Sequence, residues 1–155
     1  MTNTTTTPAA ATESTAIARS LVWHGALLSL LGLLSGFTAL FAKAPTAALS
    51  AHSIGLLEGA VLFGLAGAWS LIGVSGRKAR VIKFSLLAGF YANWIGVQLA
   101  AFWSAKNMFV VTGAGMPAGA VPWMEAIVAI LLNVSILVVL GCGLILWHSR
   151  GAARD

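Results

Sequence analysis

The feature that most constrains this chain is the stretch from Leu49 to Gly73, an apolar segment that carries two ionisable residues, His52 and Glu58. Hydrocarbon is spanned by ~20 apolar residues in a helix, so the segment is long enough to cross a bilayer. An ionisable group inside hydrocarbon costs at least ~2.5 kcal/mol even on lenient insertion scales. A chain tolerates that cost where the group faces a protein interior, a cavity or a ligand. The segment therefore predicts a membrane helix that presents a polar site.

Small residues follow His52 at helical spacing. Gly55, Gly59 and Ala60 come three, seven and eight residues after it, which places them on its side of a helix with ~3.6 residues per turn. The imidazole would then head a bare groove that could accept something flat, and Gly55 and Gly59 join His52 as candidates for a cofactor site. The alternative is that these glycines form a G-x-x-x-G pair, which only lets a neighbouring helix approach.

Composition places the chain among polytopic membrane proteins. Of its 155 residues 59% are hydrophobic and only 8% charged, which no soluble core of this size requires. The net charge of +5 comes from basic residues at the ends of apolar segments, as expected of topology signals, so nucleic-acid binding is not expected. The single cysteine, Cys142, has no disulfide partner within the chain and says nothing about redox compartment.

Apolar runs predict an all-α fold, an integral membrane bundle of four transmembrane helices. We expect the helices at approximately residues 21–41, 49–73, 82–103 and 123–147, within a domain of residues 21–149. The Thr- and Ala-rich residues 1–20 cannot bury a core and predict a disordered tail; residues 150–155 predict a short basic tail. The first run exceeds the ~7–15-residue core of a signal peptide, so we expect a retained helix.

The basic residues predict the orientation of the bundle. An up-down order places both termini and the second connection on one side, which carries Arg19, Arg77, Lys78, Arg80, Lys83, Arg150 and Arg154. The other side holds only Lys43 and Lys106. Because positive loops stay cytoplasmic, we expect both termini in the cytoplasm and a multi-pass protein of the cytoplasmic (inner) membrane. The Gly-rich connection from Ser104 to Pro122 would close the opposite end as a lid or re-entrant cap, or form a plain flexible loop.

The third predicted helix presents two different faces. Asn93 lies on a face of small residues, where its simplest role is an interhelical hydrogen bond worth ~1 kcal/mol. Tyr91, Trp94 and Gln98 lie on the other face. This aromatic surface with polar tips could bound an aromatic substrate, or it could belong to the ordinary core of the bundle.

Two further histidines, His24 and His148, lie near the predicted cytoplasmic ends of the first and fourth helices. Interfacial histidines are usually solvated groups, but together these two could make the bis-histidine haem site of a membrane electron carrier. No CxxCH, HExxH or paired-cysteine motif is present, so covalent haem and structural zinc are unsupported. A third alternative is a non-catalytic membrane protein whose polar residues only fix helix packing.

Several short runs resemble a known family. Leu49-Ser50-Ala51-His52, the glycine-spaced segment up to Glu58-Gly59, and Ala92-Asn93-Trp94 are similar to the hydroxylaminobenzene mutases. More distantly they resemble the styrene-oxide isomerases, which share a membrane layout of four helices. The resemblance extends from Leu21 to Arg150. It implies an intramolecular mutase that converts aryl hydroxylamines to aminophenols, moving the hydroxyl from nitrogen to a ring carbon, with no need for NAD(P).

The resemblance also implies a cofactor. Styrene-oxide isomerases convert an epoxide to an aldehyde with a ferric haem b held by a histidine, which corresponds to His52 in a similar Ala-His-Ser run. We therefore expect haem b with His52 as the ligand of the iron. The isomerases carry an asparagine where this chain has Glu58, and a tyrosine where it has Val97. Both departures weaken the case for epoxide chemistry, which stays as the alternative.

The implied chemistry suggests roles for the polar residues. Both reactions break a bond to oxygen and need no net electrons; a metal in a low-dielectric pocket lowers that barrier as a Lewis acid. A Glu58 carboxyl kept protonated by its surroundings would help the hydroxyl leave, and Glu58, Asn93 and Tyr91 are the candidate catalytic residues. The structural alternative for Glu58 is a neutral carboxyl bonded to a neighbouring helix. The expected partners are a small aromatic hydroxylamine, the bilayer and further copies of the chain, because the small-residue stripes exceed what one bundle needs.

Overall fold

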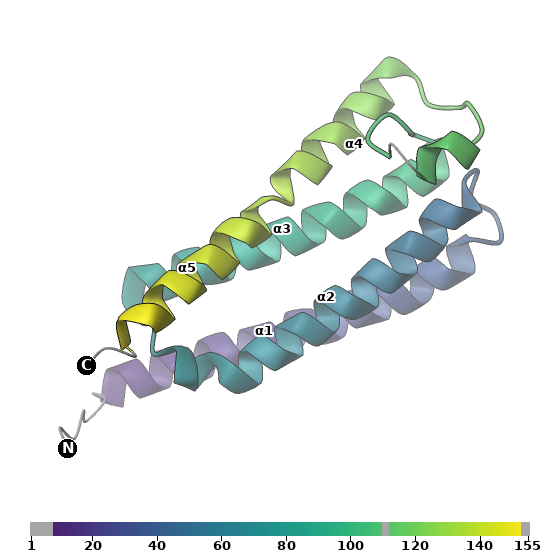
Figure 1. Cartoon of the computed structure of the whole chain (residues 1–155). Coiled ribbons are helices and arrows are strands. Elements are labelled where there is room, and N and C mark those ends of the chain that lie inside the picture. The colour runs from purple at the N-terminus through teal and green to yellow at the C-terminus, as the bar shows by residue number, and fades with distance from the viewer. Residues whose placement is uncertain (1–7, 110–111, 153–155) are drawn as a thin grey trace.

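The computed structural model describes residues 8–109 and 112–152, and within these ranges the regular structure is entirely helical (Figure 1). The elements are α1 (Pro8–Thr38), α2 (Pro45–Ile72), α3 (Gly76–Trp103), the short 3₁₀ helix η1 (Thr112–Gly115), α4 (Pro122–Val134) and α5 (Leu137–Ala152). The last two long helices are halves of one span, so the described part contains four segments long and apolar enough to cross a membrane. The predicted all-α fold with four spanning helices is confirmed.

The long helices are not packed symmetrically. α1 and α2 form an antiparallel hairpin with the most extensive contact in the molecule, and α3 lies against both. α4 and α5 rest on α3 and barely touch the hairpin. In the most apolar window of each span, 50% of the residues of α3 are buried, against 11% in the fourth span. α3 is therefore the central helix, and the start of α1 and the end of α5 lie at the same end of the molecule (Figure 1).

α1 begins earlier than the sequence predicted. Residues 8–20 are helical, so the prediction of a disordered tail over residues 1–20 is wrong for this part; residues 1–7 lie outside the described residues. Ile17 is only 4% exposed and belongs to the same buried cluster as Trp69, which gives the extension an apolar anchor. The carboxylate of Glu13 accepts a hydrogen bond of 2.8 Å from the backbone N–H of Gly76, at the turn between α2 and α3. At the other terminus, the predicted basic tail of residues 150–155 is helical as far as Ala152.

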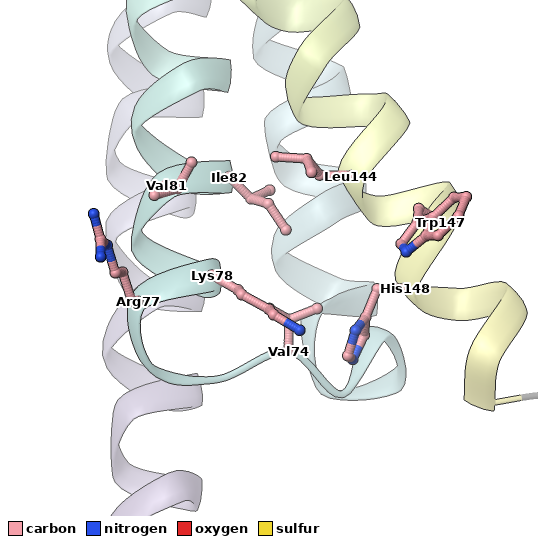
Figure 2. Close-up of a pocket in the computed structure, with 8 residues that line it drawn as sticks. All are labelled: Val74, Arg77, Lys78, Val81, Ile82, Leu144, Trp147 and His148. Atoms are coloured by element: carbon pink, nitrogen blue, oxygen red, sulfur yellow. The ribbon is translucent and has the colours of Figure 1, made fainter.

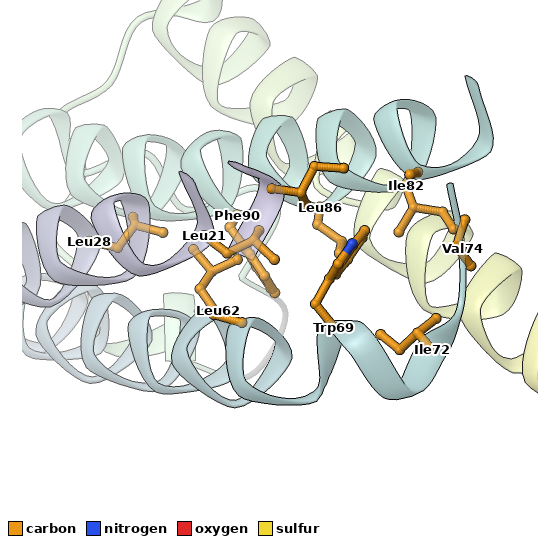
Figure 3. Close-up of a cluster of buried hydrophobic side chains, with 12 residues drawn as sticks. Leu21, Leu28, Leu62, Trp69, Ile72, Val74, Ile82, Leu86 and Phe90 are labelled. Atoms are coloured by element: carbon orange, nitrogen blue, oxygen red, sulfur yellow. The ribbon is translucent and has the colours of Figure 1, made fainter. Parts of the chain in front are cut away.

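Large apolar side chains lock α1, α2 and α3 together near the end where the chain begins and finishes. Trp69 is 1% exposed and lies among Leu21 of α1, Leu62 of α2, and Leu86 and Phe90 of α3 (Figure 3). Burying a side chain of this size contributes roughly 1.5–3 kcal/mol in a soluble protein, and in a membrane its tight packing serves the same purpose. This cluster fixes the positions of the helices that carry the polar residues.

The fourth span is interrupted after Val134, where the sequence predicted one continuous helix over residues 123–147. The amide of Asn133 and the hydroxyl of Ser135 each donate to a backbone carbonyl of the preceding turn, at 2.7 and 2.6 Å. Such bonds compete with the helical ladder and bend helices. Gly89 of α3 lies against the break, where an added Cβ would approach the side chain of Val138 to 2.6 Å.

The connection between α3 and α4 folds over the ends of α2 and α3. Met116 is 6% exposed and belongs to a buried cluster with Ala44, Ala47, Ala48 and Ala101. Ser104 adopts a left-handed conformation (φ 56°), and its hydroxyl donates to the carbonyl of Pro117. The carboxylate of Glu125 accepts the backbone N–H groups of Lys106 and Asn107 at 2.9 and 3.2 Å. In its described part the connection is thus an ordered cap rather than a plain flexible loop.

Candidate functional site

The groove expected beside His52 is filled by α1. A Cβ added at Gly55 would lie 2.6 Å from the Cα of Gly32, and one added at Gly59 would lie 2.7 Å from the carbonyl oxygen of Gly25. Contacts this short leave no room for anything but glycine. The G-x-x-x-G alternative is therefore confirmed. The prediction that Gly55 and Gly59 line an open cofactor groove is wrong, because the neighbouring backbone occupies that space.

His52 lies on the same seam between α1 and α2 and is half-buried. Its Nδ1 is 2.9 Å from the carbonyl oxygen of Gly32. A carbonyl only accepts hydrogen bonds, so Nδ1 is the donor, and in the neutral form of the ring Nε2 is the nitrogen that carries the lone pair. Gly36 leaves space for the ring, since a Cβ there would lie 3.1 Å from Nδ1. Metal-binding histidines are commonly oriented in this way, by an N–H bond from the second ring nitrogen to a backbone carbonyl.

The donor set around His52 fits one kind of metal site. Within the described residues, no three side chains of His, Cys, Asp or Glu gather in a way that could hold a metal ion. A single imidazole nitrogen can serve as the protein's ligand where a prosthetic group such as haem supplies the other ligands of the metal. Nε2 of His52 would be the atom that holds such a group, while the glycines beside it serve helix packing.

Glu58 lies six residues beyond His52, about 9 Å along the axis of α2, and faces α3. It is 8% exposed, and its Oε1 accepts a hydrogen bond of 2.8 Å from Nδ2 of Asn93. The interhelical bond predicted for Asn93 is confirmed. The other oxygen, Oε2, is buried and has no partner among the described residues. An unmet buried polar atom costs roughly 1–3 kcal/mol, so Oε2 would be stabilised by a proton, a water or a substrate.

The second polar face of α3 is bonded to α1. Three pairs share this arrangement, with an α3 side chain bonded to an α1 side chain: Tyr91 with His24 at 2.9 Å, Trp94 with Ser35 at 3.1 Å, and Gln98 with Thr38 at 2.9 Å. This face thus belongs to the core of the bundle and is not an open wall. Tyr91 is directed to α1, whereas the pair formed by Glu58 and Asn93 lies between α2 and α3, so the structure does not bond Tyr91 to that pair.

Sequence reasoning missed the α1 partners Ser35 and Thr38. A signal was present, because they lie three residues apart on the first apolar run and match the four-residue spacing of Trp94 and Gln98. The bis-histidine alternative gains no support. His24 is bonded to Tyr91, while His148 lines a cavity between α3 and α5 whose lining does not include His24 (Figure 2).

Comparisons with known proteins agree with this architecture. The sequence profile of the styrene oxide isomerase family matches residues 17–150, which include most of every span. Hydroxylaminobenzene mutase HabB of Ectopseudomonas oleovorans is 35% identical over 137 residues, or 88% of this chain and 83% of that protein. Hydroxylaminobenzene mutase HabA of the same organism is 32% identical over 108 residues, or 70% of this chain and 79% of that protein. No solved structure matches the chain.

Proposed function

Because this chain belongs to the styrene oxide isomerase family and is therefore an isomerase, we propose that it rearranges aryl hydroxylamines to aminophenols within the membrane. Membership in the family confirms the resemblance noted in the sequence. Two relatives named as hydroxylaminobenzene mutases support the choice of substrate. The observation that carries the proposal is the buried carboxyl of Glu58, with one oxygen held by Asn93 and the other unmet. Epoxide isomerisation is the second candidate, favoured by the name of the family whose profile matches.

In this proposal Glu58 acts as general acid and then as general base. Protonated on Oε2, it donates that proton to the hydroxyl oxygen of the substrate while the N–O bond breaks. The water so formed adds to a ring carbon and gives its extra proton back to the carboxylate, and the ring proton then passes to nitrogen as aromaticity is restored. Asn93 keeps Oε1 in place, which directs Oε2 to the reacting atoms. Substrate and product are isomers with the same number of electrons, so the reaction consumes neither NAD(P)H nor dioxygen.

We further propose that His52 holds haem b. Its bond from Nδ1 to Gly32 leaves Nε2 as the ligand atom. When bound, the haem would supply a Lewis acid that favours loss of oxygen from the substrate. Protein purified in detergent from haem-replete cells should show haem absorption. His52→Ala should lose it, whereas His24→Ala and His148→Ala should keep it. A colourless wild-type protein contradicts this part of the proposal.

The reaction is tested by giving membranes phenylhydroxylamine anaerobically in isotopically labelled water, without a nicotinamide cofactor. We expect 2-aminophenol, and its absence rules out the mutase. Heavy oxygen in the product shows that the oxygen re-enters from solvent instead of being transferred directly. A parallel incubation with styrene oxide distinguishes the second candidate, which predicts an aldehyde.

We propose that the protein resides in the cytoplasmic membrane with the basic end inside. Single cysteines replace Ser75 and Ala118, both exposed and at opposite ends of the bundle, after the exposed native Cys142 is changed to serine. Ser104 lies in the same connection as Ala118 but is only 1% exposed, so a cysteine there would be a poor target for labelling. A membrane-impermeant reagent should reach Ala118→Cys in intact cells and Ser75→Cys only after permeabilisation. Labelling of both from one side refutes the topology.

We also propose that the chain forms a homo-oligomer. The small-residue stripes that suggested this include Gly25, Gly32 and Gly36 of α1, which pack on α2 within one chain. Support now comes from Gly64 and Gly67 of α2 and Gly143 of α5, beside which an added Cβ would meet no described atom within 4 Å. Small residues at such positions let helices of neighbouring copies approach closely. The mass of the detergent-solubilised protein, corrected for bound detergent, tests this; a monomer contradicts it.

A further inference from the structure

A cavity of about 520 Å³ lies between the beginning of α3 and the end of α5 (Figure 2). Its walls are apolar and include Val74, Ile82 and Leu144. None of His52, Glu58 or Asn93, the polar residues of the proposed active site, lines it. It needs an explanation of its own, independent of the isomerase.

The mouth of this cavity is positively charged. Lys78 and His148 project toward one another near Val74, whereas the side chain of Arg77, which also lines the cavity, extends from the other side of α3 (Figure 2). Among the described residues, no acidic side chain is part of the lining. The carboxylate of Glu13 accepts a hydrogen bond from the backbone N–H of Gly76, next to Arg77 in the sequence. The mouth thus carries positive charge and could bind an anion from outside the described residues.

The apolar part of the cavity continues into a second groove. The two share Leu144 and Trp147, and the second groove extends along α5 past Leu140 to Ile136. Trp147 is 80% exposed at the basic end of the span, where indole rings favour the membrane–water interface. A charged mouth at the interface therefore opens directly onto an apolar track that runs into the membrane.

We propose that this surface binds an anionic phospholipid. The phosphodiester lies between Lys78 and His148, and one acyl chain follows the groove along α5. Basic pockets between helices at the membrane surface are suited to lipid phosphates. A free phosphate ion would use the mouth alone, and a second copy of the chain would cover the apolar track without an anion. Only a lipid uses both parts.

The test compares two double variants of the same charge. Arg77→Gln with Lys78→Gln removes the arginine and the lysine of the lining, whereas Arg80→Gln with Lys83→Gln removes two cations farther along α3 that do not line the cavity. Delipidated protein in detergent is titrated with phosphatidylglycerol or phosphatidylcholine and examined by native mass spectrometry. Wild type should prefer phosphatidylglycerol. The lining variant should bind it on the order of fivefold more weakly for each cation removed, since each is worth ~1 kcal/mol near a lipid surface, and the control variant should bind as wild type does.

Several outcomes overturn the proposal. Equal binding of the two lipids, or an equal loss in both double variants, shows attraction by general charge instead of a built site. Displacement of the lipid by inorganic phosphate or glycerol phosphate alone shows an anion site without an acyl track. Leu140→Gln tests that track separately and should weaken retention of phosphatidylglycerol; if it changes the oligomeric mass and not lipid binding, a second copy occupies the groove. Arg77, Lys78 and Arg80 are exposed and Lys83 is half-buried, so the melting temperature of the lining variant should match wild type and that of the control variant should be close to it.

Discussion

The three-helix unit of α1, α2 and α3 and the fourth span meet the membrane in different ways. Within the unit, polar side chains bond from one helix to another, as Asn93 does to Glu58 and Gln98 to Thr38. In the fourth span, the side chains of Asn133 and Ser135 bond to carbonyls of their own helix. The fourth span is also far less buried than α3. Hydrogen bonds between side chains of different helices are thus concentrated in α1, α2 and α3, and the fourth span contributes mainly apolar surface.

The buried polar atoms that lack a hydrogen-bond partner also belong to the three-helix unit and not to the fourth span. Among the described residues, the buried side-chain atoms without a hydrogen-bond partner are Oε2 of Glu58, Nε1 of Trp69 and Oε1 of Gln98, all in α2 and α3. Interhelical hydrogen bonds in membranes average only ~0.6 kcal/mol, less than the roughly 1–3 kcal/mol that an unmet buried group costs. Bonding alone does not explain why these residues are there. Each of these atoms therefore calls for a further partner, such as a proton, an ordered water or a bound molecule.

The largest expected effect comes from comparing two carboxyl groups, that of Glu58 in the three-helix unit and that of Glu125 in the fourth span. Glu58→Gln keeps the shape and the contact with Asn93 but removes acidity, so turnover of the hydroxylamine should fall on the order of 10²-fold or more, with a smaller change in KM. Glu125→Gln, which alters a carboxylate that only caps the 104–107 turn, should keep near wild-type turnover. Steady-state kinetics in membranes measure both. Equal turnover of Glu58→Gln and wild type would assign Glu58 a structural role.

The next effect concerns packing. Gly55→Ala places a Cβ against the backbone of Gly32, and overpacking of this kind costs ~1–3 kcal/mol. Ser70→Ala, on the same helix but exposed, should be neutral or slightly stabilising because alanine favours helices more than serine does. Unfolding of the purified variants in mixed detergent micelles compares them. A Gly55→Ala protein as stable as Ser70→Ala would show that the hairpin is looser than the contact implies.

Features of the fold that depend on neighbouring residues could be predicted from the sequence, whereas features that depend on residues far apart in the chain could not. The four spans were recognisable because apolar length is a local property. The extension of α1 was not, since it depends on the bond from Gly76 to Glu13, 63 residues away. The interruption after Val134 was missed because the apolar pattern continues through it. Its causes are side chains that bond their own backbone and the approach of Gly89 from α3.

The site divides in the same way. Asn93 was predicted as an interhelical donor because an amide in hydrocarbon needs a partner. Its partner could not be named from spacing, since the register of α2 against α3 is set by packing. The space beside His52 was misjudged for the same reason. Small residues show where something approaches, and only the neighbouring helix decides whether that is a ligand or backbone.

The smallest expected effect separates the two kinds of polar side chain. Trp94→Phe removes the bond to Ser35 and should destabilise the protein by ~0.6 kcal/mol, the average for such bonds. Asn133→Leu removes an exposed amide bonded within its own helix and should cost nothing measurable or stabilise the span. The unfolding assay used for Gly55→Ala and Ser70→Ala resolves the difference when the two are measured side by side. A larger loss for Asn133→Leu would mean that its amide has a partner outside this chain.

The contact of Gly32 with Gly55 has a consequence for how this sequence can change over generations. Each residue is already the smallest that exists, so no second substitution can compensate for a larger neighbour on the other helix. Single substitutions in succession therefore cannot replace this pair of glycines without disrupting the helix contact. Lipid-facing positions such as Leu57 and Leu71, 67% and 86% exposed, are free to exchange among apolar residues. Among descendants of this chain, the two glycines should persist together long after most of the surface around them has been replaced.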